Sequence, residues 1–360
     1  MSITAIDLFC GAGGLTRGLI DAGVKVVAGF DTDQHCKHAY EANNDGAKFH
    51  CRDVSRVTGA ELNRIWGKAK VRLLAGCAPC QPFSTAAHSK RNDDKTDPRY
   101  PLLEHFARLV RTCKPELVTM ENVPSVRQHA PFLEFTETLE ELGYHVWYSS
   151  VPCAAFGVPQ NRYRLVLMAS RLGAAPKLVR PKKPKKITVS DAIYGLPVLA
   201  AGERDQKDRI HFARNLTPLN LRRLQHSTPG GTWEDWPKEL RSACHNKATG
   251  MTFRSVYARM LADEPSPTMT TQFFNFGAGR FGHPDQDRTI TPREAALLQS
   301  FPKDYDFISP DDPLQMSKLG RMIGNAVPPK LGEAIGSAFL GHVATAKAAP
   351  RARDSSRPHR

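Results

Sequence analysis

The first 175 residues alternate two kinds of segment, and this alternation limits the fold more than any other feature of the chain. Short apolar runs rich in β-branched residues, typical of strands, are separated by amphipathic stretches that are typical of helices. We expect strands at Ile3–Phe9, Val24–Phe30, Val71–Ala75, Leu117–Met120, His145–Val151 and Arg164–Ser170, and helices at Gly14–Ala22, Gln34–Asn43, Leu102–Arg111 and Phe132–Leu142. Residues 1–175 are therefore predicted to be an α/β domain with a doubly wound, mainly parallel sheet, which binds ligands at the carboxyl ends of its strands.

Beyond residue 175 the sequence becomes irregular. Residues 176–286 are polar, interrupted by prolines and only weakly periodic, which predicts a smaller, loop-rich domain. Trp233 and Trp236 are expected in the core of this domain.

The last part of the chain regains a helical pattern. Residues 287–343 contain two such stretches, Pro292–Ser300 and Pro329–Val343, and we expect this segment to return to the first domain. The remaining residues, 344–360, are rich in Arg, Ala, Pro and Ser and are expected to be disordered.

Composition narrows the class of protein. The formal net charge of +14 favours a polyanionic partner, because lysine and arginine neutralise phosphates. The eight cysteines lack the spacing of a disulfide framework, so we expect reduced thiols. No run reaches the ~18 apolar residues of a membrane span, and the first residues lack the pattern of a secretory leader. We expect a soluble, cytoplasmic protein with no membrane partner.

A glycine-rich turn follows the first expected strand, in DLFCGAGGL (Asp7 to Leu15). Gly11 and Gly13 fit the dinucleotide pattern G-x-G-x-x-G, but Thr16 occupies its third glycine position. Taken alone, the turn fits ligand binding and a tight strand-to-helix connection equally well. Two carboxylates favour a ligand: Asp31, 18 positions after Gly13, could bind ribose hydroxyls, and Asp53 could accept from an adenine amino group.

Cys80 lies in GCAPCQPFS (Gly76 to Ser84). Cys77 and Cys80 form a C-x-x-C, so a redox pair, a zinc site and a buried structural cysteine are alternatives. Zinc needs a second pair of ligands that the sequence lacks, so we expect no metal. Glu121 in MENV, with Arg162 and Arg164 in QNRYR, would supply a carboxylate and two guanidinium groups. A thiol with these partners suits covalent chemistry on an electron-poor heterocycle.

Together these four segments resemble the cytosine-5 DNA methyltransferase family. RTITPREAALLQSFP (Arg288 to Pro302) and GNAVPP (Gly324 to Pro329) resemble its closing motifs, and the six blocks follow the family's order. The resemblance implies a Rossmann-like methyltransferase fold with residues 176–286 as a target-recognition domain. It also implies S-adenosylmethionine as cofactor and double-stranded DNA as substrate.

By the same resemblance, one set of residues is expected to bind the cofactor. Phe9 would pack on adenine, Asp31 would bind the ribose, and Asp53 and Val54 would flank the base. The family usually has Glu at the position of Asp31, and the shorter side chain keeps the carboxylate. The full expected set is Phe9, Gly11, Gly13, Gly14, Asp31, Asp53, Val54, Pro79, Leu102 and Asn325.

A second set is expected to act on cytosine. The Cys80 thiolate would add to carbon 6 of a flipped base and turn carbon 5 into a nucleophile. Glu121, protonated so that it can donate to ring nitrogen 3, would also bind the exocyclic amine. Arg162 and Arg164 would bind the pyrimidine carbonyl and anchor Glu121 or phosphate. The polar stretch 88–99 reads as a mobile loop, and the matching loop of the family closes over DNA.

DNA contacts are expected from two groups of basic residues in the 176–286 segment. Lys182, Lys183, Lys185 and Lys186 would contact phosphates, although a solvated linker is the alternative. Arg254, Arg259 and Arg280 are candidates for guanine contacts.

Four functions are compatible with these residues. We favour a DNA methyltransferase that acts as a monomer, alongside a separate restriction endonuclease. The others are methylation of RNA, a catalytically inactive DNA-binding relative, and a nicotinamide oxidoreductase. The intact Cys80 and Glu121 argue against the inactive relative, and the missing third glycine argues against the oxidoreductase.

Overall fold

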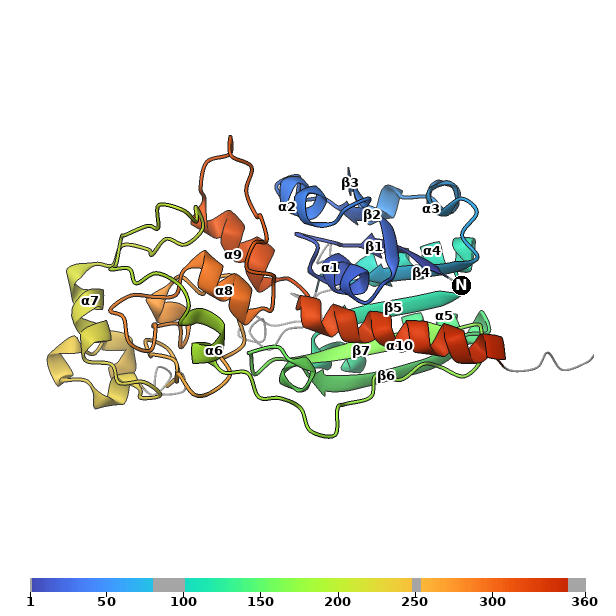
Figure 1. Ribbon diagram of the computed structural model, residues 1–360. Coiled ribbons are helices and arrows are strands. Elements are labelled where there is room, and N and C mark those ends of the chain that lie inside the picture. The colour runs from blue at the N-terminus through green and yellow to red at the C-terminus, as the bar shows by residue number, and fades with distance from the viewer. Residues whose placement is uncertain (1, 80–100, 248–253, 349–360) are drawn as a thin grey trace, which may run out of the picture.

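The computed structural model describes residues 2–79, 101–247 and 254–348. Their strands form one sheet in the order β3-β2-β1-β4-β5-β7-β6 (Figure 1). These strands are β1 (Ile3–Leu8), β2 (Lys25–Asp31), β3 (Lys48–Cys51), β4 (Val71–Gly76), β5 (Leu117–Asn122), β6 (His145–Pro152) and β7 (Tyr163–Ser170). The first five strands are parallel to one another, whereas β7 runs antiparallel to both β5 and β6. The predicted doubly wound, mainly parallel α/β sheet is confirmed.

Helices cover both faces of this sheet (Figure 1). One face packs on α1 (Gly14–Asp21), α2 (Cys36–Asn43) and α10 (Pro329–Ala348), and the other packs on α3 (Gly59–Trp66), α4 (Leu102–Cys113) and α5 (Ala130–Glu141). Successive residues of β1 show why both faces are buried, because Ala5 belongs to the first core cluster and Ile6 to the second. Strands with two apolar faces are the expected centre of such a fold.

The C-terminal helix returns to the first one. In Figure 1, α10 lies across the sheet beside α1. The two backbones approach so closely at Gly18 that a Cβ there would lie 2.1 Å from the carbonyl oxygen of Pro329. Glycine is therefore required at this contact, which packs the start of α10 directly on α1.

The remaining described α-helices lie to the left of the sheet in Figure 1. They are α6 (Val189–Ile193), α7 (Pro218–Gln225), α8 (Pro292–Leu298) and α9 (Met316–Gly324). Trp233 and Trp236 are 3% and 2% exposed and pack with Leu224, Leu240 and Phe276 in a small cluster of their own. The expectation that both tryptophans are core residues is confirmed, while the domain limits at 176 and 287 stay predictions.

A buried ion pair fixes the start of α8. Arg288 and Glu294 are 0% and 1% exposed, and the guanidinium donates to both carboxylate oxygens at 2.8 and 2.7 Å. Glu294 also accepts from the backbone N–H of Thr291, which completes a capping box at the helix N-terminus. Burial opposes ionisation of Glu294, but the hydrogen bonds and charge of Arg288 outweigh it, so the pKa of Glu294 is lowered.

We expect Glu294→Ala to lower the free energy of unfolding by about 3–5 kcal/mol, because it leaves Arg288 buried without its counter-charge. The matched control is Glu333→Ala, which removes the exposed Lys330–Glu333 pair. This substitution should change the free energy of unfolding by about 1 kcal/mol or less. Urea unfolding of both variants measures the difference. Because the folded-state pKa is lowered, the contribution of Glu294 is present above the ordinary glutamate pKa and is lost as pH falls through the folded-state value. Equal losses in the two variants would contradict this assignment.

Candidate active site

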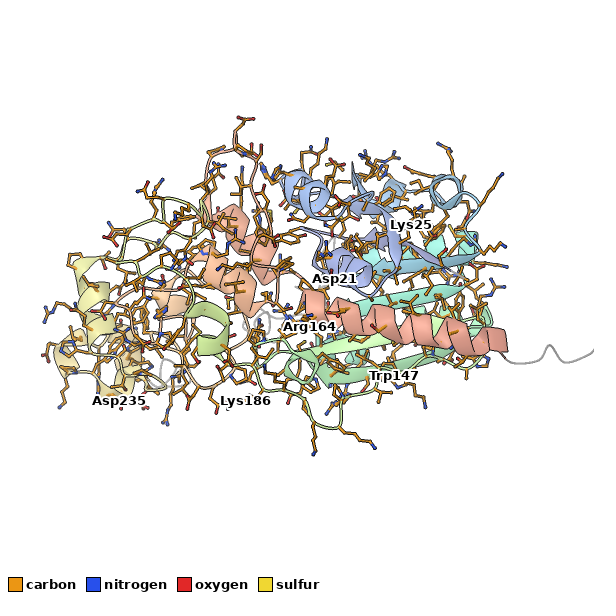
Figure 2. All side chains as sticks on the ribbon, viewed as in Figure 1. Asp21, Lys25, Trp147, Arg164, Lys186 and Asp235 are labelled. Carbon is orange, nitrogen blue, oxygen red and sulfur yellow. The ribbon has the colours of Figure 1, made fainter. Side chains whose placement is uncertain are left out.

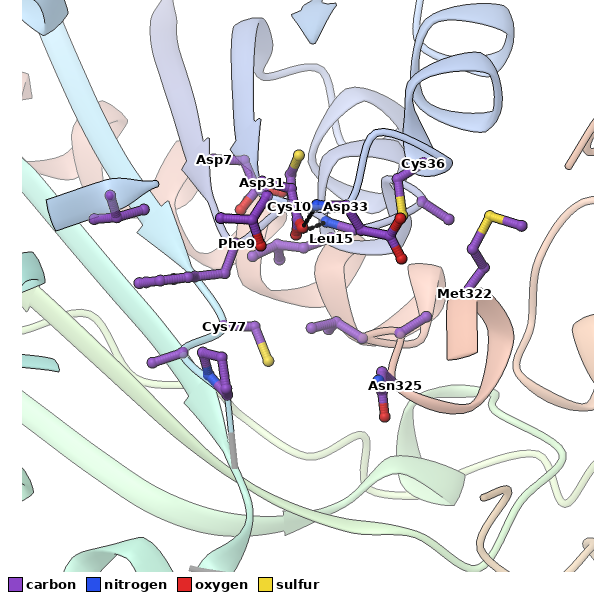
Figure 3. Close-up of a pocket in the computed structure, with 18 of the residues that line it drawn as sticks. Asp7, Phe9, Cys10, Leu15, Asp31, Asp33, Cys36, Cys77, Met322 and Asn325 are labelled. Carbon is purple, nitrogen blue, oxygen red and sulfur yellow. Dashed lines mark hydrogen bonds between the residues drawn. The ribbon is translucent and has the colours of Figure 1, made fainter. Parts of the chain in front are cut away.

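A cavity of about 410 Å³ lies where β1, β2 and β4 end (Figure 3). Residues that follow β1, β2, β3 and β4 form most of its wall. The junction between α9 and α10 closes the cavity through Arg321, Met322, Asn325, Ala326 and Val327. Because α1, which follows β1, and α4, the next described helix after β4, pack on opposite faces of the sheet, this is the switch point at which doubly wound sheets bind ligands.

Most residues of the predicted cofactor set meet around this cavity. Its lining includes Phe9, Gly11, Asp31, Asp53, Val54, Pro79, Leu102 and Asn325. Gly13 and Gly14 are not part of the lining. Gly13 has φ 91°, and a Cβ on Gly14 would lie 2.2 Å from the carbonyl oxygen of Val327. These two glycines therefore let α1 begin directly against the closing segment.

Asp31 ties two loops of the cavity together. Its carboxylate accepts hydrogen bonds from the backbone N–H groups of Gly11 and Asp33, both at 2.9 Å (Figure 3). Burial raises the pKa of Asp31, and these hydrogen bonds oppose the rise. The Asp53 carboxylate accepts from the backbone N–H of Ser55 at 2.8 Å, which lowers the pKa of Asp53. Both carboxylates are thus held in place at the cavity wall.

Phe9 is held in a strained backbone conformation. Its φ is 57°, in the left-handed region that bulky residues rarely adopt. Such a conformation costs of order 1–3 kcal/mol and persists only where the surroundings enforce it. The strain turns an aromatic ring toward the cavity directly after β1 (Figure 3).

Asp7 is a cavity residue that sequence reasoning missed. It is 0% exposed, and one carboxylate oxygen accepts from the Thr16 hydroxyl at 2.7 Å. Burial raises the pKa of Asp7 to about 7. The other oxygen, Oδ1, has no hydrogen-bond partner among the described residues. The sequence signal that could have identified Asp7 is its position as the first residue of the glycine-rich segment DLFCGAGGL.

Other lining residues outside the predicted set include three charged side chains and a thiol, those of Asp33, Arg52, Arg321 and Cys77. Arg321 lies three residues before GNAVPP, so the closing motif already marked its neighbourhood. Arg321 and Asp33 approach to 3.5 Å and join α9 to the segment after β2.

Glu121, the penultimate residue of β5, lies beside this cavity and is 3% exposed. Its Oε1 lies 2.9 Å from Nε of Arg164, which belongs to the neighbouring strand β7. Its Oε2 accepts a hydrogen bond from the Cys77 thiol at 2.8 Å. Arg164 therefore takes the place expected of an arginine that anchors Glu121.

Arg162 has different partners from Arg164. It is 3% exposed, and its guanidinium donates to the carbonyl oxygens of Met269 and Ala326 at 3.1 and 3.4 Å. Arg162 thus joins the start of β7 to the cavity's closing segment.

Cys80 and the loop at 88–99 lie outside the described residues. The chain leading to Cys80 is fixed, however, because the Asn122 side-chain amide donates to the carbonyl oxygen of Ala78 at 3.0 Å. Asn122 therefore ties the end of β5 to the segment that follows β4.

The predicted phosphate contacts lie in an extended, exposed segment. Lys182, Lys183, Lys185 and Lys186 are all exposed. Lys186, which Figure 2 labels, also pairs with Glu264 at 2.7 Å. Lys186 is therefore the one of these four for which the structure gives an ion pair.

The three arginines considered for guanine contacts differ in exposure. Arg254 is exposed and lies 3.5 Å from Glu234, and Arg280 is partly buried and donates to the carbonyl oxygen of Gly231. Arg259 is 5% exposed, pairs with Asp287 and donates to four carbonyl oxygens. The guanidinium of Arg259 is thus engaged inside the protein, which disfavours Arg259 relative to Arg254 and Arg280 as a residue that reads a base.

No helix within the described ranges is both long enough and apolar enough to cross a membrane.

Sequence comparison places this site in a family. The C-5 cytosine-specific DNA methylase family matches residues 3–340. Type II methylase M.HgiDII of Herpetosiphon aurantiacus is 47% identical over 334 residues, which cover 92% of this chain and 93% of that protein. Type II methyltransferase M1.HphI of Haemophilus parahaemolyticus is 34% identical, over 94% of this chain and 87% of that protein.

Solved structures share the fold. A putative DNA modification methyltransferase encoded within a prophage of E. coli superposes with a TM-score of 0.73 at 23% identity, covering 95% of this chain and all of that one (100%). DNMT2 of Spodoptera frugiperda superposes with a TM-score of 0.64 at 16% identity, covering 94% of this chain and 100% of that one. At these identities the likeness concerns the Rossmann-like methyltransferase fold. Together with the sequence matches, it confirms the resemblance noted from the motifs: the chain belongs to the C-5 cytosine-specific DNA methylase family.

Proposed function

We propose that this protein transfers a methyl group from S-adenosylmethionine to carbon 5 of a flipped cytosine in double-stranded DNA, through a covalent adduct with Cys80. The observation that carries the proposal is the buried Glu121 carboxylate, held between Arg164 and Cys77 beside the cavity. Family membership and the Type II methylases among its relatives support the reaction class.

The cavity residues fit the proposed cofactor. A volume of about 410 Å³ lies within the range of small-molecule sites. Phe9 offers an aromatic face for adenine, while Asp31 and Asp53 offer acceptors for ribose and amino groups. The buried Asp7 Oδ1, which has no hydrogen-bond partner among the described residues, adds a polar atom to the wall. When bound, S-adenosylmethionine supplies an electrophilic methyl group on a positively charged sulfur.

The protein's own residues would prepare the base. Carbons 5 and 6 are shielded in a duplex, so cytosine must first be flipped out of the stack. The Cys80 thiolate then forms a bond to carbon 6, and the electron pair displaced from the 5,6 double bond makes carbon 5 nucleophilic. Glu121 would bind nitrogen 3 and the amino group, where charge changes in this step. After methylation, loss of the carbon-5 proton and departure of the Cys80 sulfur restore the ring.

The mode of DNA binding is also part of the proposal. The exposed lysines 182, 183 and 185 would contribute through phosphate charge rather than base reading, consistent with the net charge of +14. Arg254 and Arg280 remain candidates for base contacts. We further propose a cytoplasmic monomer that acts separately from a cognate restriction endonuclease, as the Type II names of its relatives suggest.

Methyl transfer from tritium-labelled S-adenosylmethionine tests the proposal. We expect label in double-stranded DNA and not in transfer RNA. Cys80→Ser should abolish transfer, because a serine hydroxyl is a far weaker nucleophile than a thiolate at neutral pH. Cys51→Ala, which alters an exposed cysteine, is the matched control and should keep full activity. Label in RNA alone, or a Cys80→Ser variant with near-normal turnover, would refute the proposal.

Asp31→Ala should weaken S-adenosylmethionine binding by roughly 1.5–3 kcal/mol, the amount expected for losing a charged hydrogen-bond acceptor. DNA affinity should change less. Asp311→Ala, at an exposed site away from the cavity lining, provides the control. Calorimetric titration of the cofactor into each variant measures the effect, and unchanged affinity in Asp31→Ala would remove Asp31 from the cofactor site.

A further inference from the structure

Cys77 stands between the cavity and the buried carboxylate. It is the first residue after β4, and its backbone N–H donates to the carbonyl oxygen of Leu8 at 3.3 Å. Its half-buried side chain lines the cavity (Figure 3). The same side chain donates its thiol hydrogen to Oε2 of Glu121 at 2.8 Å. One short side chain therefore contacts both parts of the site.

The carboxylate of Glu121 is held from the two strands that flank β5. Cys77, after β4, contacts Oε2, and Arg164, on β7, contacts Oε1. Cys77 donates a hydrogen bond to Oε2, whereas Oε1 lies at ion-pair distance from Arg164 and has no hydrogen-bond partner among the described residues. The hydrogen bond from Cys77 is therefore the directional contact that restricts rotation of the carboxylate plane. Arg164 alone would leave that rotation less restricted, because its Nε approaches a single oxygen.

A cysteine has only one side-chain torsion between its backbone and its sulfur, with three staggered positions. Rotation to another position carries the sulfur away from Glu121 and breaks the contact. A ligand that fills the cavity packs against this side chain and thereby restricts its rotation. Occupation of the cavity and orientation of the carboxylate are for this reason physically linked.

We propose that Cys77 is a positioning residue: its thiol orients Glu121 for the base and makes that orientation depend on the occupied cavity. The proposal deepens the function proposed above and rests on it for the role of Glu121. Cys77 does not itself react with the base or the cofactor.

Steady-state methyl transfer to DNA tests this role through two variants. Cys77→Ala removes the donor, and we expect kcat to fall roughly 10-fold, the effect of losing one hydrogen bond that orients a reacting group, while KM for DNA and cofactor shifts by less than about threefold. Cys77→Ser keeps a donor and should recover most of the loss. Cys51→Ala should match the wild type. In a Glu121→Gln background, Cys77→Ala should lower kcat much less than it does in the wild type, because both substitutions disturb the same contact.

An infrared measurement of the thiol tests the contact without using activity. The S–H stretching band obtained by subtracting the Cys77→Ala spectrum from the wild-type spectrum should indicate a hydrogen-bonded thiol. Glu121→Gln should shift this band toward a weaker hydrogen bond, and S-adenosylhomocysteine should shift it when it fills the cavity. Neither change is expected from a cysteine that only fills space.

The two measurements separate this proposal from the function on which it rests. A wild-type protein that methylates no DNA would overturn the proposed function. The infrared bands would still show whether the Cys77 thiol donates a hydrogen bond to Glu121. An S–H stretching band that shifts neither in Glu121→Gln nor on addition of S-adenosylhomocysteine would overturn the positioning role. The positioning role would also be overturned if Cys77→Ala had the same kcat as Cys51→Ala. It would be overturned as well if kcat fell in Cys77→Ala and Cys77→Ser did not restore it.

Discussion

The site depends on one constraint, the placement of a buried carboxylate at the end of β5. Removing a charge from water costs several kcal/mol unless partners are supplied, so Glu121 requires a counter-charge within the fold. The sheet provides it because β7 runs antiparallel to β5, which puts the start of β7 beside the end of β5 and brings Arg164 to Glu121. On the other side, the parallel strand β4 ends at the same edge and delivers Cys77. A wholly parallel sheet would place the start of β7 at the opposite edge.

The same edge joins the carboxylate to the cavity. Asn122 holds the backbone of Ala78, Arg162 binds the carbonyl oxygen of Ala326, and both of these backbone segments line the cavity. The closing segment is itself fixed by the packing of α10 on α1, where glycine is required for the close approach of the two helices. Residues from both ends of the chain therefore set the geometry at a single point of the sheet.

Local pattern predicted much of this arrangement. Alternating strands and helices indicated the sheet, and because parallel strands end at one edge, residues at those ends, such as Asp31 and Pro79, could be expected to meet. Side-chain environments were harder to predict. Arg259 is a basic residue in a basic segment, as expected of a DNA contact, but its side chain is buried. This burial could not be predicted locally, because the carbonyl groups that accept its hydrogen bonds come from segments distant in sequence. Cys77 seemed relevant only as half of a C-x-x-C, since nothing local showed that β5 would bring Glu121 to its thiol.

The central claim is that this site methylates carbon 5 of cytosine in DNA at a defined sequence. Bisulfite sequencing of a plasmid from a host that expresses the protein tests it directly, with a host expressing Cys80→Ser as the comparison. In DNA from the host that expresses the wild type, the account predicts protected cytosines that all lie in one sequence context. In DNA from the host that expresses Cys80→Ser, it predicts no protected cytosines beyond the host background. Identical patterns in the two hosts would contradict it.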